Sequence, residues 1–154
     1  MREFDYIVIG GGSGGLASAQ RAAEYGARAI VFEHGPLGGT CVNVGCVPKK
    51  VMWNVANVAH TIHSAGAFGF DVDLKAHDWG SLKTSRDAYV RRLNGIYRRN
   101  LDNRSVELVE SHARFSGSHE VVDGGGNVYY GKHILIATGG YPTVPGIPGA
   151  EHGI

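Results

Sequence analysis

The segment FDYIVIGGGSGG, residues 4–15, decides the fold of this chain. Phe4 to Ile9 is a short apolar run of the kind that forms a buried strand, and a run of glycines follows it. The stretch from Leu16 to Tyr25 is rich in Ala and favours a helix, which Gly26 is well placed to end. A strand, a glycine-rich turn and a helix in this order predict the first unit of an α/β fold.

The glycines have the spacing G-x-G-x-x-G at Gly10, Gly12 and Gly15. In this pattern the first glycine permits a tight turn, the second lets the backbone approach a pyrophosphate, and the third lets the helix pack closely on the strand. Glu33 ends the next apolar run, where a carboxylate can accept hydrogen bonds from a ribose. The alternative is a plain glycine-rich turn with a solvent-facing Glu33. The flanking strand and helix favour a dinucleotide site, with the phosphates at the helix N-terminus.

The rest of the chain continues the alternation of strands and helices. Helices are predicted from about Lys50 to Ser64 and from Trp79 to Asn100, with a turn-rich stretch between them. A further buried strand is predicted at Ala29–Phe32. From Val106 onward a turn is predicted at Asp123 to Gly126, and the strand-like runs are Val106–Val109, Val128–Tyr130 and His133–Ala137. The sequence therefore predicts an α/β, Rossmann-like domain with a short antiparallel β extension.

Composition excludes several classes of function. The 15 basic and 14 acidic residues are mixed along the chain, which argues against binding to nucleic acid or to a membrane surface. No apolar run approaches the roughly 20 residues that cross a bilayer. Strand-like residues begin at Phe4, so we expect no targeting peptide in the chain as given. Two cysteines are typical of redox or metal chemistry in a reducing compartment, so we expect a cytoplasmic protein, with a mitochondrial form as the alternative.

The two cysteines lie in the segment GGTCVNVGCVPKK, residues 38–50. Residues five apart in a regular helix have Cα atoms roughly 8 Å apart and on different faces. A disulfide needs a Cα separation below about 7 Å, so bonding of Cys41 to Cys46 requires a distorted segment, which Gly45 and Pro48 favour. A redox-active pair is predicted. A zinc site that includes His34 and a pair of buried free thiols remain alternatives.

This segment resembles the redox-active segment of the flavin-dependent pyridine nucleotide–disulfide oxidoreductases. The residues Val51-Met52-Trp53, the short gap between Glu33 and the cysteines, and ILIATGG at residues 134–140 resemble the branch of that family that reduces glutathione disulfide. The resemblance covers essentially the whole chain. It implies FAD at the glycine motif, and it implies NADPH-dependent reduction of glutathione disulfide to glutathione in cell redox homeostasis.

The resemblance also implies roles for individual residues. Cys41 is similar to the interchange thiol that attacks the substrate, Cys46 to the thiol that faces the flavin, and Lys49 to a lysine beside the flavin ring. Hydride from NADPH would reduce FAD, and the flavin would reduce the Cys41–Cys46 disulfide. No metal is expected. The full set of implied FAD contacts is Gly10, Gly12, Ser13, Gly14, Gly15, Glu33, Thr40, Cys46, Lys49, His112, Ala113, Thr138 and Gly139.

Residues that would bind the disulfide substrate are implied in the same way. They are Ser13, Arg21, Ile96 and Tyr97. An aromatic residue at helical spacing is also typical of a core position, so Tyr97 has a structural alternative. Some family members carry a further Arg where this chain has Gln20, which leaves the partners of the substrate carboxylates open.

The resemblance further indicates what this sequence lacks. No match is present for the family's catalytic His–Glu pair or for its second dinucleotide motif. We therefore expect residues 1–154 to be the N-terminal part of an FAD-binding domain, without the NADPH-binding and dimer-interface domains of a homodimer. Such a chain is expected to be inactive alone. A sister reductase of the thioredoxin or trypanothione type and a non-catalytic flavin-binding module remain alternatives.

Overall fold

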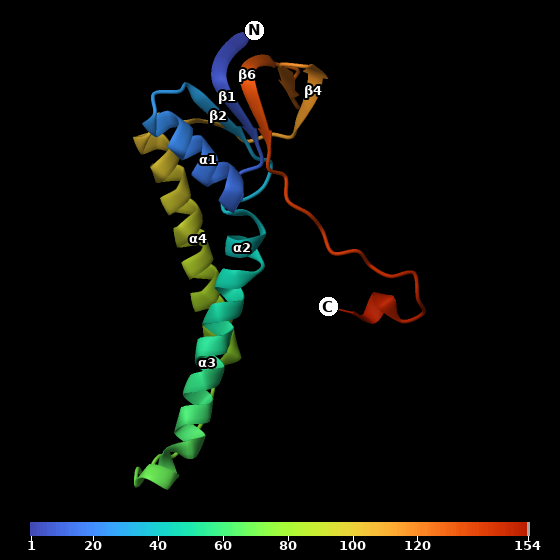
Figure 1. The fold of residues 1–154 in the computed structure, drawn as a ribbon. Coiled ribbons are helices and arrows are strands. Elements are labelled where there is room, and N and C mark those ends of the chain that lie inside the picture. The colour runs from blue at the N-terminus through green and yellow to red at the C-terminus, as the bar shows by residue number, and fades with distance from the viewer. Residues whose placement is uncertain (154) are drawn as a thin grey trace.

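The computed structural model describes residues 1–153, and its centre is one six-stranded sheet (Figure 1). The strand order is β3-β2-β1-β6-β5-β4. The first four strands of this order run parallel, and the β6-β5-β4 part is antiparallel. The predicted α/β class with an antiparallel extension is confirmed. The strands are β1 (Arg2–Ile9), β2 (Ala29–Phe32), β3 (Glu107–Val109), β4 (Ala113–Gly117), β5 (Glu120–Asp123) and β6 (Val128–Ile136).

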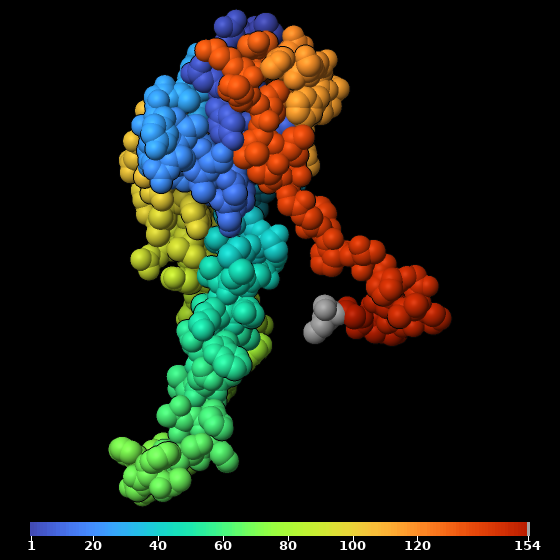
Figure 2. Space-filling model, viewed as in Figure 1, coloured from blue at the N-terminus to red at the C-terminus, as the bar shows by residue number. Residues whose placement is uncertain are grey.

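The helices divide between the sheet and an arm. Helix α1 packs on β1 and β2, and α3 runs away from the sheet. Helix α4 runs beside α3 and back to the sheet, where its last turns pack against α1 and β3 (Figure 1). After β6 the chain leaves the body as a separate extended segment (Figure 2). Within residues 1–153, no helix has the length and apolar character needed to cross a bilayer. The helices are α1 (Ser13–Glu24), α2 (Gly39–Asn43), α3 (Cys46–Ser64) and α4 (Trp79–Asn103), with 3-10 turns η1 (Ala65–Phe68) and η2 (Ala150–His152).

Two apolar clusters form the core, and strands β1 and β2 contribute to both. Alternate residues of a strand point to opposite faces, so Val8 and Val31 join one cluster while Ile7 and Ile30 join the other. The first cluster is covered by α1 and α4, and its remaining members are Leu16, Ala19, Ala29, Leu37, Leu101 and Val106. The second includes the edge-on pair of Phe32 and Tyr129, with ring centroids 5.0 Å apart.

Three helix boundaries differ from the sequence-based prediction. Helix α1 begins three residues early, at Ser13, and α4 continues to Asn103. Helix α3 begins at Cys46, not near Lys50. Pro48 lies in the first turn of α3, where backbone N–H groups have no intrahelical partner, so the proline does not delay the helix start.

The runs at Val128–Tyr130 and His133–Ala137 form one strand and not two. Strand β6 is continuous from Val128 to Ile136 and pairs with β1 along its length. Gly131 permits this continuity, because a Cβ there would lie 2.8 Å from Cγ1 of Ile7. The predicted turn at Asp123–Gly126 is confirmed, and the Asp123 carboxylate holds it by accepting N–H bonds from Gly125 and Asn127.

Candidate flavin and redox-disulfide site

A cavity of about 390 Å³ lies where β1, β2 and β6 end at the same edge of the sheet. Ligands of open α/β sheets bind at this edge, outside the carboxyl ends of the strands. The cavity brings together nine of the predicted site residues, which are Gly10, Gly12, Ser13, Gly14, Glu33, Thr40, Cys41, Thr138 and Gly139. They come from four separate parts of the sequence, so the fold assembles them.

Each glycine of the motif has a distinct structural role. Gly10 has a φ of +111°, and a Cβ there would lie 2.3 Å from the carbonyl oxygen of Ala137. A Cβ on Gly15 would lie 1.9 Å from the carbonyl oxygen of Gly10, so Gly15 allows the helix to approach the strand. Gly12 instead borders the open cavity, with Gly39 Cα as the nearest atom to an added Cβ, at 3.7 Å. These positions match the turn, packing and ligand-approach roles expected of the motif.

The Glu33 carboxylate is held in place at the cavity by backbone donors. It accepts hydrogen bonds from the N–H groups of Gly11 and Gly35, both at 2.7 Å. Its side chain is 12% exposed, so it lies at the cavity wall and not in bulk solvent. This geometry excludes the alternative of a solvent-facing Glu33 and leaves a carboxylate beside the space where a ribose would lie.

His34 and His112 extend this end of the cavity. Their rings stack with centroids 4.0 Å apart and an interplanar angle of 19°. His34 lines the cavity, and its Nδ1 lies 3.4 Å from the Glu33 carboxylate. The stack thereby places His112 beside the cavity although it comes from the loop before β4. Ala113, the other predicted contact there, begins β4 and is outside the cavity lining.

The cysteine segment is distorted, as the spacing argument required. Helix α2 ends at Asn43 and α3 begins at Cys46, and Gly45 between them has φ −118° and ψ −111°, outside the helical region. Both cysteines are free thiols in this structure. The neighbouring Cys46 thiol is the main cause that raises the pKa of the Cys41 thiol, and burial adds to it.

The zinc alternative gains no support from the arrangement of the side chains. Within residues 1–153, no three His, Cys, Asp or Glu side chains gather as a metal site would require. His34 instead faces Glu33 and His112.

Several predicted residues lie outside the cavity lining. Cys46 and Lys49 begin α3, and Lys49 borders an apolar groove between α3 and α4. Arg21 lies two turns along α1 and pairs with Glu24. Tyr97 packs against the first core cluster, which agrees with its structural alternative. The structure therefore does not bring Arg21, Ile96 or Tyr97 to the cavity, and their substrate roles remain predictions.

Other residues, which the sequence did not predict, also line the cavity. The loop after Glu33 contributes His34, Gly35 and Pro36, and α2 contributes Gly39 and Asn43. Gly39 has a φ of +61°, and an added Cβ would lie 2.8 Å from Gly12 Cα, so this position needs a glycine. The doublet Gly38-Gly39 was the sequence signal for such a close backbone approach. Two glycine segments thus meet at their backbones. Ala137, Gly140, Tyr141 and Val44 complete the lining.

The residues present fit FAD. Gly12 leaves room for backbone approach beside the start of α1, Glu33 offers a fixed acceptor, and the lining includes Cys41 of the redox segment. When the pyrophosphate of a dinucleotide lies at the start of α1, its ribose lies near the end of β2, where the carboxylate of Glu33 can accept a hydrogen bond from a ribose hydroxyl. The same cavity reaches Cys41, the first cysteine of the predicted redox pair.

The fold and this site define a class of redox protein. The chain belongs to the pyridine nucleotide-disulphide oxidoreductase family, whose model matches residues 4–154. Glutathione reductase of Yarrowia lipolytica is 54% identical to it over 98% of this chain and 35% of the relative. Glutathione reductase of Schizosaccharomyces pombe is also 54% identical, over 98% of this chain and 34% of the relative. The chain thus spans about a third of the length of these curated relatives.

Proposed function

We propose that the complete protein is an FAD-containing enzyme that uses NADPH to reduce glutathione disulfide. The observation that carries this proposal is the single cavity that joins the dinucleotide cradle of Gly10, Gly12 and Glu33 to Cys41. The identity with two curated glutathione reductases supports the choice of disulfide. We also propose a cytoplasmic location, which cell fractionation would check.

The cysteine pair would perform the exchange with substrate. FAD, when bound, supplies two electrons from NADPH to the Cys41–Cys46 disulfide. The Cys41 thiolate then attacks one sulfur of the substrate, forms a mixed disulfide and releases one thiol. Cys46 attacks the mixed disulfide, releases the second thiol and restores the Cys41–Cys46 bond. Two thiols leave for each disulfide consumed, so atoms and electrons balance.

The complete protein should oxidise NADPH in the presence of glutathione disulfide. We expect kcat/KM for glutathione disulfide to exceed that for oxidised thioredoxin and for trypanothione disulfide by at least about tenfold, since a site built for one polar ligand rejects others. The measurement is NADPH absorbance loss with each disulfide under the same conditions. A larger kcat/KM for either competitor would transfer the proposal to the corresponding sister reductase.

We also propose that the complete protein is a homodimer to which α3 contributes contacts. Helix α3 has 19 residues and none of them is buried. The stretch from Val51 to Phe70 contains no Asp, Glu, Lys or Arg, while Trp53, Val58 and Phe68 are each more than half exposed. An apolar, uncharged face of this kind can meet a copy of itself without like-charge repulsion.

Light scattering after size exclusion should give the mass of two subunits for the complete protein. Val58→Asp should shift the mass toward one subunit, because a carboxylate would be buried in the contact. Asp71→Asn, just beyond the uncharged stretch, serves as the control and should leave the dimer intact. A monomeric wild-type protein would contradict the proposal.

A further inference from the structure

The side chains of Asn43 and Asn94 connect the redox segment to helix α4. We propose that these two asparagines are positioning residues, which hold Cys41 at the flavin cavity while the Cys41–Cys46 bond forms and breaks. The role rests on the proposed function, since it concerns how the same cysteine pair is held. Asn94 lies outside the cavity lining, so it acts through the segment and not on a ligand.

The Asn43 amide closes a loop around the start of helix α2. Its Nδ2 group donates to the carbonyl oxygens of Pro36 at 3.1 Å, Leu37 at 3.2 Å and Gly39 at 2.9 Å. Side-chain bonds of this kind satisfy backbone groups that a turn leaves without partners. Residues 36–43, which include Cys41, are therefore folded back on one side chain.

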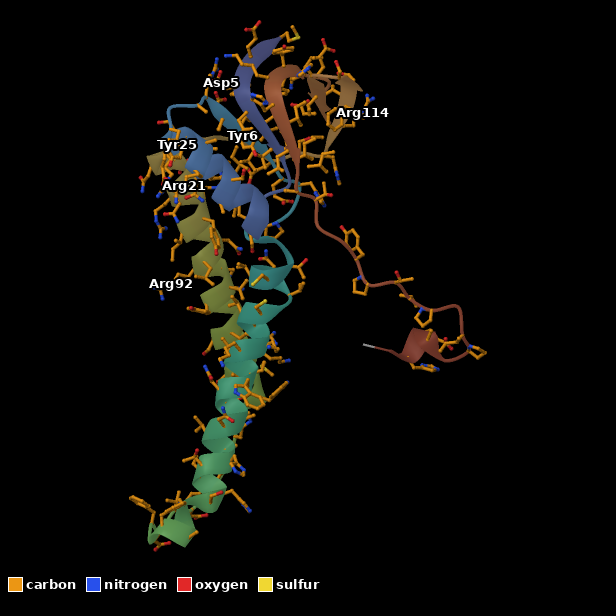
Figure 3. All side chains as sticks on the ribbon, in the orientation of Figure 1. Asp5, Tyr6, Arg21, Tyr25, Arg92 and Arg114 are labelled. Carbon is orange, nitrogen blue, oxygen red and sulfur yellow. The ribbon has the colours of Figure 1, made fainter. Side chains whose placement is uncertain are left out.

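Asn94 fixes this loop to the middle of α4. Its Nδ2 group donates to the carbonyl oxygen of Leu37 at 2.7 Å and to Oδ1 of Asn43 at 2.9 Å. Residues two apart on a helix point to nearly opposite sides. In agreement with this, Arg92 projects from α4 on the side away from α2 in Figure 3. Asn94 thus lies on the face of α4 that meets α2.

The same loop contacts the dinucleotide cradle. The N–H group of Gly38 donates to the carbonyl oxygen of Gly11 at 2.8 Å. The next residue, Gly39, meets the backbone of Gly12 so closely that an added Cβ would lie 2.8 Å from Gly12 Cα. The loop therefore lies between α4 and the cradle, and it places Cys41 relative to both.

The anchors all lie on the Cys41 side of the break between the two helices. They end at Asn43, whereas Gly45 interrupts the helix with a φ of −118° and a ψ of −111°. Cys46 follows that break, begins α3 and is exposed. Cys41 is therefore the fixed member of the pair, and Cys46 is the member that moves as the bond forms.

A fixed Cys41 favours the disulfide over two separate thiols. Each thiol meets the other at an effective concentration, which falls when one of them can move in more directions. Loss of the Asn94 bonds frees α2 to move on α4, so it should lower this concentration. In exchange with glutathione disulfide, the two protein thiols give the Cys41–Cys46 bond and two molecules of glutathione, so atoms and electrons balance.

The test is the equilibrium of the complete, flavin-loaded protein with anaerobic mixtures of glutathione and glutathione disulfide. Alkylation and mass spectrometry measure the fraction of chains that carry the Cys41–Cys46 bond. Asn94→Ala should lower the equilibrium constant for forming this bond by about tenfold, which makes the reduction potential about 30 mV less negative. Asn94→Asp keeps the shape of the side chain but loses both N–H donors, so it should shift the potential in the same direction.

Steady-state kinetics should show the same loss in the step that closes the bond. For both Asn94 variants, kcat with glutathione disulfide should fall by roughly tenfold while KM stays within about twofold of wild type. The double variant Asn43→Ala, Asn94→Ala should shift the potential by less than the sum of the two single variants, because both side chains act through one network.

Asn100→Ala is the matched control, because Asn100 lies on the same helix, is half-buried like Asn94 and takes no part in this network. It should leave the potential and kcat unchanged. A potential that is unchanged or more negative in both Asn94 variants, an equal shift in Asn100→Ala, or additive shifts in the double variant would overturn the positioning role. A wild-type protein whose cysteines form no bond in any of these mixtures would instead refute the proposed redox function.

Discussion

The variants Cys41→Ser and Cys46→Ser of the complete protein should both lose disulfide reduction, yet differ in their visible spectra. Activity should fall by at least roughly 10³-fold in each, because the exchange needs a bond between two sulfur atoms that forms and breaks in every cycle. In Cys41→Ser the remaining Cys46 thiolate should lie against oxidised flavin and give a long-wavelength charge-transfer band. Cys46→Ser should lack that band.

The deciding measurements are the visible spectrum of each variant and the mass of its glutathione adduct. Cys46→Ser should form a mixed disulfide at Cys41, because the interchange thiol stays available. In this structure Cys41 lines the cavity and Cys46 lies outside its lining, so the spectra decide which of the two thiols faces the flavin. A band in Cys46→Ser alone would reverse the two roles. Spectra of flavin unaffected by either change would refute the redox pair.

Gly12→Val should abolish FAD binding while leaving the fold intact. Gly12 has φ −82° and ψ −170°, a conformation open to any residue, and an added Cβ meets only Gly39 Cα at an ordinary 3.7 Å. The two γ carbons of Val would instead occupy the cavity where the pyrophosphate approaches the backbone. Flavin per protein chain, measured by absorbance, should fall from about one to below about a tenth.

Two comparisons separate blocked binding from unfolding. Gly66→Val makes the same substitution at the tip of the α3–α4 arm, where an added Cβ meets no atom within 4 Å, and should keep full flavin occupancy. Glu33→Ala should weaken FAD binding by about 1–3 kcal/mol, the cost of an unmatched hydrogen bond. Full occupancy in Gly12→Val would show that the pyrophosphate lies elsewhere.

Much of the fold followed from local pattern. Short apolar runs, closed by Gly10 and by Glu33, predicted β1 and β2, and the helical period predicted α1, α3 and α4, because these features act within a few residues of sequence. The glycine roles at Gly10 and Gly15 were also predictable, since each depends on a backbone approach that the motif itself encodes. Helix starts were less predictable, because Pro48 fits a first turn as readily as it ends a helix.

The composition of the cavity could not be derived from local pattern. His112 reaches the cavity only through its stack on His34, a contact between residues far apart in sequence. Gly39 belongs to the site because its backbone meets that of Gly12, and no periodic signal encodes such a meeting. The ion pair of Arg104 with Glu24 likewise depends on how α1 and α4 end beside each other.

The most direct test of a redox-active Cys41–Cys46 pair beside a flavin is differential alkylation of the complete protein before and after anaerobic reduction with one equivalent of NADPH. Two electrons convert one disulfide to two thiols. We expect neither cysteine to be alkylated in the oxidised protein and both Cys41 and Cys46 to be alkylated after NADPH is added. If each cysteine were alkylated to the same extent before and after NADPH is added, the redox-active disulfide would be contradicted.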